Sequence, residues 1–227
     1  MSNVCCEDPD HVAEAERAVS AMSIAGTKSK KKSATKPSSK FNPPPPPEGP
    51  MSLNIGILTV SDRAASGEYQ TGDLSGPAVE QALAEVIRKY NSNEAQKTLL
   101  SCNFTKKGIV PDDMGEIGKM LSLWSGKTNG TSVCDIIFTT GGTGFASRDV
   151  TPEATAKVID KECKGLMAFV LGECAAVQPL AALSRGTAGV TGKTLIVNLP
   201  GNPEAVGEIL NILFPLLLHA VKDMKRI

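Results

Sequence analysis

The chain has few of the residues that nucleic-acid-binding surfaces use. Aromatic residues make up 4% of its 227 residues, too few for a platform on which single-stranded bases would stack. Lysine plus arginine total 24, as do aspartate plus glutamate, so the net charge is zero. Whole-chain electrostatics therefore do not favour binding to a polyanion. We expect no nucleic-acid partner.

Metal-binding and membrane signals are scarce as well. Six cysteines are present, but no two form a C-x-x-C pair, and the chain has two histidines, which argues against a zinc site. Cys102 and Cys134 lie in apolar, strand-like runs and are interpreted as small buried hydrophobic residues. No apolar run approaches the roughly 20 residues of a membrane span, and no apolar stretch of signal-peptide type opens the chain. We expect a cytoplasmic location and no membrane partner.

Composition divides the chain into residues 1–50 and 51–227. The first part contains the basic run KSKKKSATKPSSK and five consecutive prolines, and such a segment cannot bury enough apolar surface to offset its chain entropy. We predict a disordered, solvated tail, with a nuclear-targeting or phosphate-binding role for the lysine run as the alternative. The second part has the length and apolar content of a single domain.

Strand-like and helix-like segments alternate from residue 53 onward. The strands are expected at 53–61, 97–105, 134–140 and 193–201, and the helices at 75–90, 112–126, 151–162 and 202–224. The third helix is expected to begin with Thr151 as N-cap and Pro152 at N1, and the last to bend or break near Pro215. This alternation predicts an α/β fold with a mostly parallel sheet.

A glycine-rich loop, within FTTGGTGFASRDVTPEAT at 138–155, joins the third strand to its helix. In open α/β sheets, ligands bind at the edge where the parallel strands end. Gly141, Gly142 and Gly144 would let backbone N–H groups approach an anion closely, and the following helix N-terminus adds positive potential. Neither the P-loop nor G-x-G-x-x-G is present, so a purely structural glycine turn stays an alternative.

Three aspartates follow strands at this same edge, namely Asp62, Asp112 and Asp149. Carboxylates grouped around a polyphosphate would bind Mg²⁺, which offsets charge in phosphoryl or nucleotidyl transfer. Each aspartate alone could instead cap a helix or close a turn.

Other polar loop residues are candidates for substrate binding. They are Ser61, Asp73, Ser75, Gly76, Pro200, Gly201 and Asn202. A polar loop at 183–194 adds Arg185, which could pair with a phosphate or carboxylate, and Lys193 as a point charge. A surface salt bridge is the alternative for this loop.

Taken together, these motifs resemble the molybdopterin adenylyltransferase family, which includes a bacterial enzyme and the G domains of the plant protein and of gephyrin. The resemblance is carried by ILTVSDRAASGEYQ, DLSGP, VPDD, IIFTTGGTGFASRDVTPEAT, ALSRGTAGVTGKTLIVNLPGNP and the final helix, and covers about residues 53–225. It implies a three-layer α/β/α domain, usually a homotrimer. It also implies transfer of AMP from Mg-ATP to the terminal phosphate of molybdopterin, with release of pyrophosphate.

The resemblance also implies roles for single residues. Asp112 and Asp149 match the family's catalytic aspartates and would hold Mg²⁺. The substrate-binding positions it adds are Thr140, Gly141, Gly142, Thr143, Gly144 and Ser184. Two positions depart from the pattern: Asp113 replaces a glutamate, and Leu74 replaces a charged residue, so that any phosphate contact by its side chain is lost.

The family's fused members carry a second domain that inserts molybdate, and none follows here, so we expect adenylylation only, with a separate molybdenum insertase domain or protein as partner. A non-catalytic molybdopterin-binding or scaffold protein of the same fold is the alternative. A generic nucleotide-binding α/β domain is a third possibility. Retention of both Asp112 and Asp149 favours the enzyme.

Overall fold

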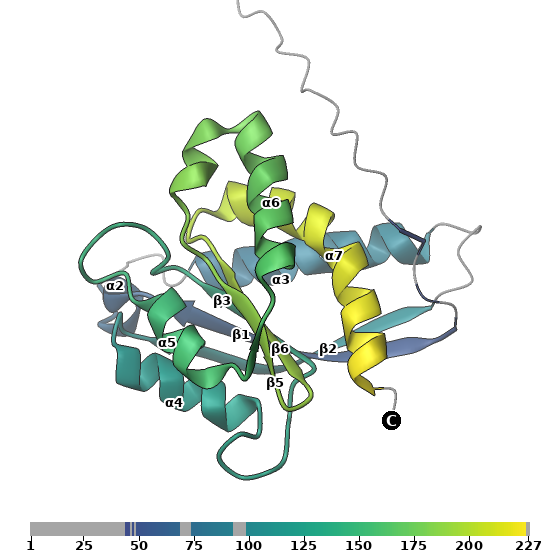
Figure 1. Ribbon diagram of the computed structural model, residues 1–227, viewed down its shortest axis with the longest axis horizontal. Helices are drawn as coiled ribbons and strands as arrows, with labels where there is room; N and C mark the ends of the chain where they lie inside the picture. Colours follow the sequence, from purple (N-terminus) through teal and green to yellow (C-terminus); the bar gives the residue numbers. More distant parts are fainter. Residues whose placement is uncertain (1–43, 46, 48, 69–73, 93–98, 226–227) are drawn as a thin grey trace, which may run out of the picture. The chain divides into compact units, whose positions relative to one another are not determined.

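The computed structural model describes residues 44–45, 47, 49–68, 74–92 and 99–225 (Figure 1). Most of the predicted tail lies outside these residues, so its disorder stays a prediction. The elements, in chain order, are β1 (Met51–Val60), α2 (Asp62–Ala65), α3 (Ser75–Asn91), β2 (Leu100–Val110), α4 (Met114–Trp124), β3 (Ile136–Thr140), α5 (Thr151–Val158), β4 (Lys161–Glu162), α6 (Lys164–Val177), η1 (Pro179–Leu183), β5 (Ala188–Thr191), β6 (Thr194–Leu199) and α7 (Pro203–Lys225).

The strands form one six-stranded sheet in the order β2-β1-β3-β6-β5-β4. The first four of these run parallel to one another, whereas β5 and β4 are antiparallel to their neighbours. The predicted mostly parallel α/β sheet is therefore confirmed. All four parallel strands end at the same edge, which brings the loops after β1, β2, β3 and β6 together.

Both faces of the sheet are buried under helices, so the domain has three layers (Figure 1). Along β3, Ile136 and Phe138 belong to one hydrophobic cluster and Ile137 to the other, as the two-residue period of a strand requires. Apolar residues of α3, α6 and α7 complete the first cluster, and those of α4 and α5 complete the second. Burial on both faces explains why the central strands are near-continuous apolar runs.

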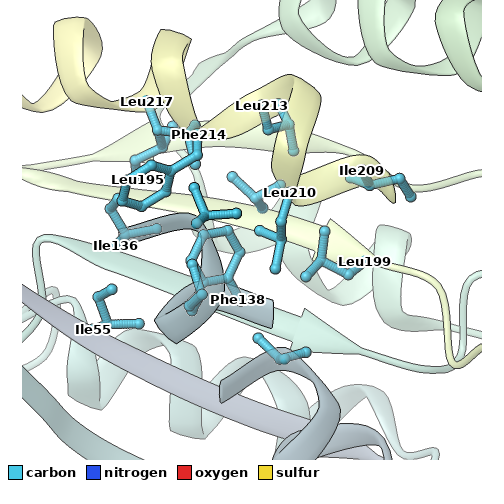
Figure 2. Close-up of a cluster of buried hydrophobic side chains, with 14 of the residues drawn as sticks. Ile55, Ile136, Phe138, Leu195, Leu199, Ile209, Leu210, Leu213, Phe214 and Leu217 are labelled. Carbon is cyan, nitrogen blue, oxygen red and sulfur yellow. The ribbon is translucent and has the colours of Figure 1, made fainter. Parts of the chain in front are cut away.

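Helix α7 provides much of the larger cluster. Figure 2 shows its Leu210, Leu213 and Phe214 lying over Phe138 and Leu195 of the sheet. In the part of the chain that the structure describes, α7 is the one helix that could cross a membrane by length and composition alone. Its apolar side chains instead pack on the sheet. Pro215 lies inside α7, which bends without being interrupted (Figure 1).

Several elements differ from the sequence predictions. The expected polar loop at 183–194 contains β5, and neither α6 nor the two-residue β4 was predicted. The apolar residues of α6 are spread around its circumference, so they do not mark a single stripe in the sequence. Cys134 is buried as predicted, whereas Cys102 is only half-buried. Burial raises the pKa of the Cys102 thiol to about 12 and keeps it protonated at neutral pH.

Candidate functional site

The site lies where the four parallel strands end. The register pairs Val60 with Val110, and Thr140 with Leu199, so the loops that follow leave the sheet side by side. In Figure 1, α2 and the loop that joins β3 to α5 lie at the same end of the sheet. Helix α2 begins directly after β1, and the Ser61 hydroxyl caps it by accepting a bond of 3.3 Å from the Ala64 amide. Ser61 therefore shapes this turn.

Asp62 and Asp112 bind each other's backbone. The Asp62 amide donates to Asp112 Oδ2 at 3.0 Å, and the Asp112 amide donates to Asp62 Oδ1 at 2.9 Å. The pair joins the loops after β1 and β2, and it holds two carboxylates close together. The residue that caps α4 is the next one, Asp113, which accepts from two amides of the first turn. Asp112 is therefore not the helix cap.

The environment of Asp112 works against its ionisation. Partial burial raises the pKa of its carboxyl, and the charges of Asp62 and Asp149 raise it further. The hydrogen bond from the Asp62 amide and the positive charge of Arg148 lower it, but less. Raised carboxyl pKa values are frequent where a site is built to receive a cation or a proton.

The glycine loop follows β3 with two residues in the left-handed region. Gly141 has φ +98° and Gly142 has φ +63°. A Cβ on Gly142 would lie 2.3 Å from Thr151 Oγ1 and 3.0 Å from Asp112 Oδ1. Thr151 closes this turn, since its hydroxyl donates to the Gly141 carbonyl at 2.9 Å and its amide to the Gly142 carbonyl at 3.1 Å. The fold itself therefore requires glycine at position 142.

Thr151 was predicted as the N-cap of α5, and this is wrong. The N-cap position is Val150, which makes no side-chain cap bond, and Thr151 is the first helical residue with Pro152 after it. The buried Thr151 hydroxyl is used by the glycine turn instead. The Thr151 hydroxyl therefore donates to a backbone carbonyl outside the helix and does not accept a bond from the first turn of α5.

Asp149 lies in the same loop and does not cap α5 either. Its Oδ2 accepts from the Ala146 amide at 3.1 Å, while its own amide donates to the Ala146 carbonyl at 2.9 Å. A Cβ on Gly144 would lie 2.8 Å from Asp149 Oδ2. Glycine at 144, which has no positive φ, therefore leaves room for this carboxylate.

Arg185 holds the glycine loop in place. Its Nε donates to the Gly144 carbonyl at 2.7 Å and its Nη2 to the Asp149 carbonyl at 2.6 Å, and its Nη1 pairs with Glu153. Its backbone amide donates to the Thr143 carbonyl at 2.9 Å. The salt bridge that the sequence suggested for this loop is therefore present, together with two hydrogen bonds to backbone carbonyls. Contact of Arg185 with a substrate stays a prediction.

Three more of the predicted site residues, Thr140, Ser75 and Asn202, make hydrogen bonds near the ends of the parallel strands. The buried Thr140 hydroxyl donates to the Pro200 carbonyl at 2.9 Å, which joins the ends of β3 and β6. Ser75 is the first residue of α3, after Leu74 at the N-cap position, and its hydroxyl donates to the Gly201 carbonyl at 3.2 Å. Asn202 caps the start of α7 through the Glu204 amide. Asp73 lies outside the described residues.

Two further residues of the β5 side were candidates. Ser184 Oγ accepts from the Gly186 amide at 3.4 Å, next to Arg185. Lys193 lies in the turn between β5 and β6, at the opposite edge of the sheet, and so takes no part in this site. The position of Lys193 could not be predicted, because the segment interpreted as a loop contains strand β5, which carries the chain to the other end of the sheet.

A hollow of about 400 Å³ lies beside the start of α3. It is lined by Gly76 and Pro77 of α3, Ile57 and Thr59 of β1, and Lys107 and Ile109 of β2, with others. Its size falls within the range of small-molecule sites. Gly76, which is buried, thus forms part of the wall of this hollow.

Within the described part of the chain, the loop has unused hydrogen-bonding capacity. The amides of Gly142, Thr143 and Gly144 donate no hydrogen bond there, and neither Asp112 Oδ1 nor Asp149 Oδ1 accepts one. Successive unpaired amides form a concavity suited to an anion, and the free carboxylate oxygens suit a hard cation. The described residues contain no group of three or more His, Cys, Asp or Glu side chains that could hold a metal ion.

Fold and site together define an α/β domain that has, at the edge where its parallel strands end, a glycine loop with unpaired amides in the described residues and a pair of carboxylates. A sequence profile described as a probable molybdopterin binding domain matches residues 56–219. A molybdopterin adenylyltransferase from Helicobacter pylori is 38% identical over 171 residues, covering 75% of this chain and 87% of that protein. The crystal structure of the molybdopterin biosynthesis enzyme MoaB from Thermus thermophilus matches with TM-score 0.63 and 38% identity, covering 76% of this chain and 96% of that one.

A longer relative is also similar. The molybdenum cofactor synthesis protein cinnamon from Drosophila melanogaster is 38% identical over 170 residues, which make up 75% of this chain and 25% of the fly protein. The chain thus spans about a quarter of that relative. The chain belongs to the molybdopterin-binding domain family of molybdenum cofactor biosynthesis, and the resemblance carried by its motifs is confirmed.

Proposed function

We propose that this protein is a molybdopterin adenylyltransferase. It would transfer AMP from Mg-ATP to the terminal phosphate of molybdopterin. A phosphate oxygen of molybdopterin attacks the α-phosphorus of ATP, the bond between the α-phosphorus and the bridging oxygen to the β-phosphate breaks, and pyrophosphate leaves. The relative from Helicobacter pylori bears this activity in its name and is matched over 87% of its length.

The observation that carries the proposal is the pairing of free amides with free carboxylate oxygens on adjoining loops. The amides of Gly142, Thr143 and Gly144 would hold a phosphate of ATP or of molybdopterin, because they point at no acceptor within the described residues. Arg185 keeps these amides in place through the carbonyls of Thr143 and Gly144. Preorganised donors of this kind stabilise charge as it develops in a transition state.

Asp112 and Asp149 fit the role of Mg²⁺ ligands. Each has one carboxylate oxygen tied to a backbone amide, which orients the group, and one that accepts no bond from the described residues. Mg²⁺ is usually bound by one or two carboxylates together with substrate phosphates, which agrees with the absence of a closed protein cage in the described chain. When bound, Mg²⁺ would neutralise charge on the phosphates and on the departing pyrophosphate.

The test is a coupled measurement of product and pyrophosphate. We expect pyrophosphate only when ATP, Mg²⁺ and molybdopterin are all present, in equal amount to adenylyl-molybdopterin. Asp149→Asn should abolish release while leaving molybdopterin binding within a few-fold of wild type. Tight molybdopterin binding without pyrophosphate release from the wild-type chain would contradict the proposal and would indicate the non-catalytic binding protein.

Assembly, location and partner belong to the same proposal. We expect a homotrimer in the cytoplasm that passes its product to a molybdenum insertase in a separate domain or protein. Light scattering during gel filtration measures the mass of the assembly. A monomer that turns over at full rate would remove the trimer from the proposal without affecting the chemistry.

A further inference from the structure

Phe145, which directly follows the glycine loop's GGTG, is the most exposed large hydrophobic side chain of the described residues. It is 72% exposed, in a chain whose other described aromatic rings are buried or half-buried. Leaving an aromatic ring in water is unfavourable, so a position that keeps one exposed requires a physical reason. The contacts of the residues on either side of Phe145 show how the ring is held in this exposed position.

The backbone that carries this ring is held on both sides. Arg185 binds the carbonyl of Gly144, the residue before it, and the carbonyl of Asp149, four residues after it. The amide of Ala146, the next residue, donates to Asp149 Oδ2 at 3.1 Å. The ring therefore projects from an ordered loop, and a side chain with two torsion angles loses little entropy when it meets a ligand.

One face of the ring is already occupied. The Arg185 guanidinium lies over it at 6.0 Å from the ring centroid, and this guanidinium is itself held by Glu153. A cation beneath an aromatic ring is attracted to its π face, which fixes the ring's orientation. Because the side chain is largely exposed, its opposite face is open, and Phe145 follows directly in the chain on the residues whose amides donate no hydrogen bond in the described part.

We propose that Phe145 is the stacking surface for the fused heterocyclic ring of a substrate at this site, either the purine of ATP or the pterin. The inference rests on the proposed adenylyltransferase function, because it assigns the ring partner of a phosphate held by the glycine loop. Bicyclic nitrogen heterocycles stack on phenyl rings whatever their substituents, so Phe145 contributes affinity and position. It contacts no reacting atom and takes no part in proton transfer.

A tryptophan reporter tests stacking without turnover. The chain has one tryptophan, Trp124, which is 3% exposed and shielded from added ligands. In Phe145→Trp, we expect ATP or molybdopterin to quench the new emission, whereas tripolyphosphate, which has no ring, should not. Leu99→Trp is the control, since Leu99 is 68% exposed just before β2, at the opposite end of the strands. The ligand that quenches at position 145 but not at 99 identifies the stacked ring.

Steady-state kinetics of Phe145 variants provides a second test of the stacking proposal. Phe145→Ala should raise the KM of the stacked substrate about 5- to 150-fold with kcat changed far less, and Phe145→Tyr should stay within about twofold of wild type. Unchanged KM values for both substrates in Phe145→Ala, or no quenching in Phe145→Trp, would overturn the proposal. So would a smaller assembly in Phe145→Ala, because the ring would then be a subunit contact. Quenching without pyrophosphate release would uphold stacking and refute the transferase.

Discussion

At the scale of single residues, the carboxylates of the site are held together against their mutual repulsion. Asp62 and Asp112 are tied by reciprocal bonds to each other's amides, and Asp149 is near enough to raise the pKa of Asp112. An arrangement of this kind reduces stability in the free protein and favours a bound cation. Sites of function are commonly places where stability and activity conflict.

The substitution Asp112→Asn separates the effect of this carboxylate on stability from its effect on activity. The amide oxygen can still accept from the Asp62 amide, so we expect the melting temperature at neutral pH to equal or exceed that of wild type. Adenylylation should fall about 10²- to 10³-fold, the usual loss when one strong electrostatic contact is removed. Thermal melts and turnover on the same samples check this. An active Asp112→Asn enzyme would exclude Asp112 from the chemistry.

The raised pKa of the Asp112 carboxyl determines how its contribution to stability depends on pH. Burial holds the pKa of Asp112 in the folded protein above 3.8, its ordinary value, so the folded state binds this proton more tightly than the unfolded state does. The contribution of Asp112 to stability is therefore full below the unfolded pKa and is lost as pH rises through the folded pKa. The melting temperatures of wild type and Asp112→Asn should converge in acid and separate toward neutrality. Mg²⁺ affinity of wild type should fall over the same window as the carboxyl takes up its proton.

Glycine is required at positions 142 and 144 for different structural reasons. Gly142→Ala should lower stability by roughly 1–2 kcal/mol from its positive φ alone, with more from the collision with Thr151. Gly144→Ala meets only the movable Asp149 carboxylate, so it should reduce activity more than stability. Gly118→Ala is the control: nothing lies within 4 Å of its Cβ position in α4, and stability should rise by about 0.5–1 kcal/mol. Denaturant midpoints and turnover measure all three, and equal losses of stability at 142 and 144 would contradict this distinction.

At the scale of elements, a buried polar network joins the strands of the site to α5. The Asn198 amide group donates to Thr139 Oγ1 and Thr155 Oγ1, both at 2.9 Å, and its oxygen accepts from the Thr187 amide at 3.1 Å. Asn198, Thr139 and Thr155 are all buried, so removal of the Asn198 amide group would leave the two threonine hydroxyls without this partner in the interior. The network thereby links β6, β3 and the helix that follows the glycine loop.

Asn198→Ala should therefore destabilise the protein by about 1–3 kcal/mol, because buried donors and acceptors are left unpaired. Asn103→Ala is the matched control on β2, where the side chain is exposed and, among the described residues, bonds to Ser52 and Asn54 alone. Its effect should stay within about 0.5 kcal/mol. Chemical denaturation of the two variants gives the comparison, and equal losses would mean that the network adds nothing to stability.

At the scale of the whole molecule, the residues just before β1 contact the domain. Pro47 is buried, and the carbonyl of Pro45 lies 2.8 Å from Nε2 of His219 in α7. Composition alone placed these residues in the tail, because prolines give no apolar periodicity. The contact is on α7, whereas the candidate site lies at the loops after the parallel strands.

A chain that begins at Met51 should therefore fold and adenylylate molybdopterin at the wild-type rate. It should unfold at a somewhat lower temperature than one that begins at Pro44, because the bond to His219 is worth about 0.5–1.5 kcal/mol. Calorimetry and turnover on the two truncated chains test this. A folded chain from Met51 without activity would show that the preceding residues serve the reaction.

Much of the fold could be predicted from the sequence, because its decisive signals are local. Near-continuous apolar strands alternating with amphipathic helices require a parallel sheet covered on both faces, and Val79, Leu83 and Val86 of α3 are buried as their spacing predicts. The glycine loop and the aspartates could be placed at one edge because parallel strands all end on the same side. The motifs that these loops contain were specific enough to identify the family.

Tertiary structure alone decided which partner each polar side chain takes. Asp112 bonds to an amide 50 residues away, Arg185 to carbonyls 36 and 41 residues away, and Thr151 to the glycine turn instead of its own helix. Such pairings depend on how the sheet brings distant loops together, and no pattern along the chain encodes them. A short strand such as β5 likewise forms only because β6 offers its edge. Local sequence sets the elements, and the free energy of packing them decides which hydrogen bonds between them can form.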